Sequence, residues 1–176
     1  MRQEWWSAYW AASDCENYLE EVIEEDPNFY DAYFELGVIN YYPAVAVTGF
    51  TSTLAWIGGM SGDCELGLEY LSLVADKGKL FKAEALVALG IIYNGFENDL
   101  PASREYYSRL LEIHPENNLA AVQIQRINFT LLIDEKGVEY FTENFETLKE
   151  EYNIDDVTDL NILGYYLMNQ ERIDDA

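Results

Sequence analysis

The 176 residues are 49% hydrophobic and 15% aromatic, which is enough apolar material for a folded domain with a sizeable core and argues against a disordered chain. The formal net charge of −23 argues against nucleic-acid binding and against electrostatic attachment to an anionic membrane, because both need clustered lysines and arginines. The acidity then serves either solubility, including in a salty habitat, or attraction to a basic partner.

Apolar residues recur with helical periodicity along most of the chain, and no segment alternates as a strand would. The sequence therefore predicts an all-α fold with short connections. In chain order, the predicted helices cover approximately residues 5–12, 15–25, 28–42, 64–77, 79–93, 100–113, 118–133, 137–151 and 160–169.

Several boundaries of these helices carry recognisable signals. Ser13 or Asp14 is predicted to cap the second helix, and Asp63 precedes the fourth. Pro101 suits the first turn of the helix that it opens. Gly37 lies inside the third helix, where glycine costs about 1 kcal/mol relative to alanine. A close contact with a neighbouring helix would explain that glycine.

Residues 36–62 form a run without a single charged side chain. Its length is that of a transmembrane helix, but one proline, several glycines and a group of Ser and Thr residues interrupt it, so no membrane span is expected. We instead expect a buried extra helix at about residues 51–57. A hydrophobic lid or docking surface is the functional alternative.

Two segments of the chain begin with the same pattern of a bulky residue, Leu-Gly and an aromatic residue. Leu36-Gly37 belongs to the first and Leu89-Gly90 to the second, and 53 residues separate the two glycines. This pattern resembles the tetratricopeptide repeat, a pair of antiparallel helices about 34 residues long, so that about 19 residues are extra. The resemblance implies an α-solenoid of helical hairpins with an apolar helix inserted at about residues 43–62.

More narrowly, residues 37–118 are similar to a group of bacterial repeat proteins of unassigned function. Tyr41-Tyr42, the apolar insert, Gly62-Asp63 and Pro115-Glu116-Asn117 carry this similarity. An Arg commonly follows the Gly-Asp pair in that group, whereas this chain has Cys64.

Residues 160–176 match a first repeat helix, its turn and the first residue of a second helix. We therefore expect one helical domain over residues 1–176 whose last repeat is cut short, as in a piece of a longer array. Self-association through that uncovered last helix is a further expectation. The first six residues contain no signal peptide, so the cytoplasm is the default compartment and a mature extracytoplasmic chain is the alternative.

The sequence contains no recognisable catalytic or metal site, and no cofactor is expected. His114 is the only histidine and has no recognisable nucleophile or partner acid. The acidic cluster at residues 20–26 lacks the spacing and central glycine of a calcium loop. The spacing of Cys15, Cys64 and His114 in the sequence does not match that of a set of metal ligands. A packed thiol is expected for Cys15, and a Cys15–Cys64 disulfide is the alternative.

The resemblance also implies which side chains form the inner face of the repeats, where such proteins bind partners. They are Asp31, Phe34, Val38, Tyr41, Glu84, Val87, Ile91 and Asn94. This face is apolar with acidic edges, which argues against the clamping of a C-terminal carboxylate by Lys and Arg.

Three functions follow as hypotheses. The first is a non-enzymatic scaffold that binds an apolar or basic-amphipathic protein segment on the inner face. The second is a small-molecule or lipid carrier in which residues 43–62 line an apolar cavity beside Trp56. The third is a structural or regulatory module of a longer chain.

Overall fold

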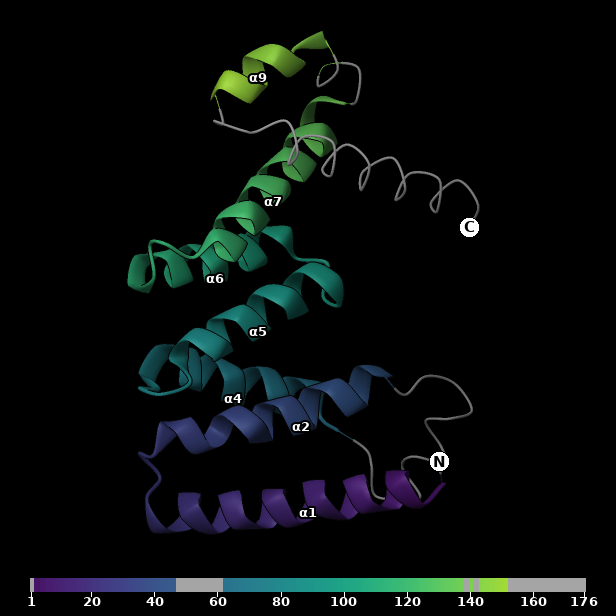
Figure 1. Ribbon diagram of the computed structural model, residues 1–176, viewed down its shortest axis with the longest axis vertical. Helices are drawn as coiled ribbons and strands as arrows, with labels where there is room; N and C mark the ends of the chain where they lie inside the picture. Colours follow the sequence, from purple (N-terminus) through teal and green to yellow (C-terminus); the bar gives the residue numbers. More distant parts are fainter. Residues whose placement is uncertain (1, 47–61, 138–139, 141–142, 152–176) are drawn as a thin grey trace. The chain divides into compact units, whose positions relative to one another are not determined.

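The computed structural model describes residues 2–46, 62–137, 140 and 143–151, and all of its regular elements there are helical (Figure 1). The elements are α1 (Arg2–Glu25), the 3-10 turn η1 (Tyr30–Ala32), α2 (Tyr33–Ala46), α4 (Cys64–Lys77), α5 (Lys82–Gly95), α6 (Leu100–Ile113), α7 (Asn118–Lys136) and α9 (Phe145–Glu151). The predicted all-α class is confirmed for this part of the chain. The chain divides into two compact units, Met1–Asn98 and Asp99–Ala176, and the single domain stays a prediction.

The predicted break near Ser13 is wrong, because α1 runs without interruption from Arg2 to Glu25. Neither glycine nor proline occurs in this stretch, so nothing ends a helix there. Ser and Asp favour helix starts only where the chain enters the helix from another conformation. The helix ends before Pro27, as predicted.

The first unit is organised around the contact between α2 and α4, with α1 on the α2 side and α5 on the α4 side (Figure 1). Two glycines allow the close approach of α2 and α4. A Cβ on Gly37 would lie 2.7 Å from Leu71 Cγ, and a Cβ on Gly67 would lie 2.7 Å from Tyr41 N. The close helix contact expected at Gly37 is therefore confirmed.

Three of the helices begin at a local side-chain cap. Asp63 Oδ1 accepts from Leu66 N of α4 at 3.1 Å, and Asp99 Oδ1 accepts from Ala102 N of α6 at 3.0 Å. Asn117 caps α7 in the same way. Helix α5 differs, because Phe81 precedes it and provides no side-chain cap.

The core of the first unit lies where α2, α4 and α5 meet. Its fully or nearly fully buried apolar side chains are Ala32, Leu36, Tyr41, Leu71, Val74, Ala75, Ala85, Leu86, Leu89 and Ile92. Tyr33 and Tyr70 add an edge-to-face contact between α2 and α4, with ring centroids 5.1 Å apart.

The second unit is built on the packing of α6 against α7. Tyr107 and Leu110 of α6 are buried, as are Ile127 and Phe129 of α7. Helix α7 ends at Gly137, whose φ of 88° is a left-handed conformation that favours glycine. Within the helix predicted over residues 137–151, Tyr140 and Glu143 are helical, a turn follows at Asn144, and α9 then runs over Phe145–Glu151.

Two predicted segments, the extra helix at residues 51–57 and the last helix at residues 160–169, lie outside the described residues. None of the helices in the described part combines the length and the apolar character that crossing a membrane requires.

Candidate functional site

The eight predicted partner-binding residues all belong to η1, α2 and α5 of the first unit. Two ring contacts relate α2 to α5. Phe34, near the start of α2, stacks on Phe81, just before α5, with centroids 5.1 Å apart and planes at 6°. Tyr41, in the second half of α2, meets Phe96, just after α5, with centroids 6.0 Å apart. The two helices therefore run in the same direction.

Six of the eight residues keep part of their side chain accessible, and we call them together the α2–α5 face: Phe34, Val38, Glu84, Val87, Ile91 and Asn94. Glu84 and Ile91 are exposed, and Ile91 retains 45% of its accessible surface. The other four are half-buried. Apolar side chains make up most of this face.

Asp31 has a different place, because its side chain is only 7% exposed and points to the loop before α5. Its Oδ1 atom accepts from the backbone N–H groups of Lys79, Leu80 and Phe81 at 3.0, 2.9 and 2.9 Å. Gly78 leaves room for it, since a Cβ there would lie 3.0 Å from the same oxygen. Asp31 thus fixes the backbone of the loop that leads into α5, from another segment of the chain.

Tyr41 is fully buried at 0% exposure, and its hydroxyl donates to Glu97 Oε1 at 2.6 Å. Burial, and then the neighbouring Glu97 carboxylate, raise the pKa of the Tyr41 hydroxyl. Asp31 and Tyr41 therefore bond within the unit rather than facing solvent on the α2–α5 face.

Cys64 lies at the start of α4, and both cysteines are free thiols. Burial first, then the charges of Glu97 and Asp63, raise the pKa of the Cys64 thiol above its ordinary value. Since the thiolate is the nucleophile, this environment suppresses the reactivity of Cys64.

No group of three or more His, Cys, Asp or Glu side chains in the described ranges is arranged to hold a metal ion. His114 is exposed at the end of α6, and its Nδ1 atom lies 3.8 Å from Glu116 Oε1. The absence of a metal and of a catalytic residue stays a prediction for the whole chain.

Sequence reasoning missed three interactions: the bonds from Asp31 to the loop before α5, the Tyr41–Glu97 hydrogen bond and the Phe34–Phe81 stack. Each of them joins residues from distant parts of the chain, so no local sequence pattern signals them.

Comparisons with protein-family models, with curated proteins and with solved structures found no match to this chain.

Proposed function

We propose that the chain is a non-enzymatic interaction module built from tetratricopeptide-like helical hairpins. Three features support the repeat architecture. Helices α2 and α4 pack closely through Gly37 and Gly67. Helix α5 packs on α4, and the ring contacts of Phe81 and Phe96 with α2 indicate that α2 and α5 run in the same direction. Parallel first helices of successive repeats are what the sequence pattern of this family implies.

The observation that carries the binding proposal is the accessible apolar surface of the α2–α5 face. Ile91 is 45% exposed in the middle of α5, one helical turn from the half-buried Val87, and Phe34 is half-buried on α2. Apolar side chains that a stable helix leaves in water gain free energy when a partner covers them. Glu84 beside them favours a partner that carries basic as well as apolar groups.

The probe that tests this is a fluorescein-labelled helical peptide of alternating Leu and Lys faces, titrated with the protein and followed by fluorescence anisotropy. Ile91→Ser removes an exposed isoleucine from the face and is expected to weaken binding by about 5- to 30-fold, which corresponds to roughly 1–2 kcal/mol. Phe34→Ala should weaken peptide binding by more than Ile91→Ser does.

Ile113→Ser is the matched control, because Ile113 is 42% exposed but lies at the end of α6. A second control is the same peptide with Glu in place of Lys, which the acidic protein should repel. Equal affinity of the Ile91→Ser and Ile113→Ser variants would mean that the basic peptide binds by general charge attraction, and the proposal for this face would be withdrawn.

A further inference from the structure

The segment formed by the last residue of α4, the loop before α5 and the first residue of α5 is basic and apolar, in an otherwise acidic unit. It contains Lys77, Lys79 and Lys82, three of the ten basic residues of the chain, whereas no Lys or Arg occurs between Arg2 and Lys77. Leu80 at its tip is 71% exposed, and Phe81 is exposed as well. We call residues 77–82 the lysine loop.

The backbone of the lysine loop is held in one conformation. The Asp31 carboxylate fixes three consecutive backbone N–H groups of the loop, from Lys79 to Phe81. Lys82 Nζ also donates to Asp76 O at 3.1 Å, and Lys77 Nζ lies 5.0 Å from the centre of the Tyr30 ring. A loop fixed in this way loses little conformational entropy when it docks, which favours binding.

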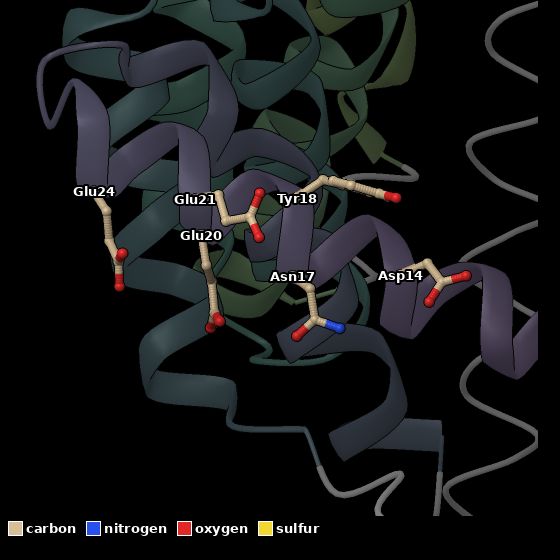
Figure 2. Close-up of a pocket in the computed structure, with 6 residues that line it drawn as sticks. All are labelled: Asp14, Asn17, Tyr18, Glu20, Glu21 and Glu24. Atoms are coloured by element: carbon tan, nitrogen blue, oxygen red, sulfur yellow. The ribbon is translucent and has the colours of Figure 1, made fainter.

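Helix α1 offers a surface of the opposite charge. Asp14, Asn17, Tyr18, Glu20, Glu21 and Glu24 line a shallow pocket on this single helix (Figure 2). Tyr18 is 69% exposed, and Val22, one turn further on, is exposed too. We call this surface the acidic face of α1. Like the lysine loop, it combines apolar groups with charges of one sign.

We propose that the lysine loop of one molecule docks on the acidic face of α1 of a second copy. The two surfaces complement each other in charge, Lys79 and Lys82 against Glu21 and Glu24, and each brings exposed apolar groups to the contact. Because the two surfaces differ, the contact is head-to-tail, and it adds molecules into an open chain or a ring instead of closing at a dimer.

The net charge of −23 gives this association a distinctive dependence on salt. At about 0.01 M ionic strength the Debye length is about 30 Å, so two whole molecules repel each other. At about 0.15 M it is about 8 Å, which screens distant charges but preserves the attraction between groups in contact. At about 1 M the Debye length is about 3 Å, and the attraction between groups in contact is weakened too. Association is therefore strongest at intermediate salt.

Sedimentation equilibrium of the full chain, from about 5 to about 500 μM protein, tests the proposal at these three salt concentrations. The weight-average mass is expected to rise with concentration, most steeply at the intermediate salt. The Lys79→Glu/Lys82→Glu variant and the Glu21→Lys/Glu24→Lys variant should each lose this rise. An equimolar mixture of the two variants should regain it, because each then meets a surface of opposite charge.

Matched controls carry the same changes of net charge on the second unit. They are Arg104→Glu/Lys136→Glu for the first variant and Glu105→Lys/Glu112→Lys for the second, all at exposed positions. Both controls should associate as the wild type does. A wild type that stays monomeric throughout the range overturns the proposal. Variants that associate as well as the wild type, or a mixture that stays monomeric, overturn it equally, because another surface or no surface is then responsible.

Discussion

The bonds from Asp31 to the loop before α5 lead to a quantitative prediction for the Asp31→Ala variant. Hydrogen bonds to a charged group contribute about 1.5–3 kcal/mol each when the partner is left without a substitute. The three bonds are part-buried, so water can replace part of each in the variant and reduces the loss to about 1 kcal/mol per bond. With three amide donors, the free energy of unfolding should fall by about 3 kcal/mol.

Urea unfolding followed by tryptophan fluorescence is the suitable assay. All four tryptophans, Trp5, Trp6, Trp10 and Trp56, fall within residues 1–98, the range of the first unit, so the signal reports on the unit that contains the Asp31 bonds. Asp31→Asn keeps an oxygen acceptor but removes the charge, and should lose about half as much stability as Asp31→Ala. Glu24→Ala, at an exposed position on α1, is the control and should change stability by less than about 0.5 kcal/mol.

A second readout locates the effect. Amide hydrogen exchange at Lys79, Leu80 and Phe81 should accelerate in Asp31→Ala more than exchange at the buried Leu71 of α4. A loss of stability below about 0.5 kcal/mol, or unchanged exchange at the three loop amides, would refute the reasoning that the carboxylate stabilises the loop before α5.

Two further predictions concern packing and pH. Gly67→Ala should destabilise the first unit by about 2 kcal/mol or more, because the added Cβ would lie 2.7 Å from Tyr41 N. Gly95→Ala is the control and should be neutral or stabilising by up to about 1 kcal/mol, because no atom lies within 4 Å of its added Cβ. Thermal melts that rank the two variants the other way would contradict the packing of α2 against α4. The raised pKa of Tyr41 means that its stabilising contribution is complete below the unfolded pKa of 10.0 and declines as pH rises above it. Tyr41→Phe should therefore be less stable than the wild type at pH 7, by about 1–2 kcal/mol for the lost bond to Glu97, and lose less stability between about pH 9 and 11. Parallel pH profiles of the two proteins in urea unfolding would disprove this assignment.

The parts of the fold that local chemistry determines could be predicted from the sequence. Asp63 and Asp99 mark the starts of α4 and α6, because an N-cap acts within three residues of itself. Gly37 could be interpreted as a close helix contact because a glycine inside a helix needs a compensating reason. The same local reasoning failed at Ser13, where a capping residue lies inside one continuous helix.

The candidate site was less predictable, because its details depend on contacts between distant residues. Asp31 bonds to loop amides 48–50 positions later in the chain, and no local pattern contains that pairing. The repeat register placed Asp31 and Tyr41 on the inner face, but it could not tell which side chains on that face remain accessible. Ile91 does, whereas Tyr41 is fully buried.

The bonds from Asp31 also bear on how freely this chain can change its length. Asp31 lies before the uncharged stretch at residues 47–61, and the residues that donate to Asp31, residues 79–81, lie after that stretch. The bonds therefore join the chain before the stretch directly to the chain after it. Doubling the length of a connection costs only about 0.6 kcal/mol in loop-closure entropy, which is less than the three bonds contribute. An insertion within residues 47–61 should therefore cost less stability than the loss of the Asp31 carboxylate, because the Asp31 bonds do not depend on the length of that stretch.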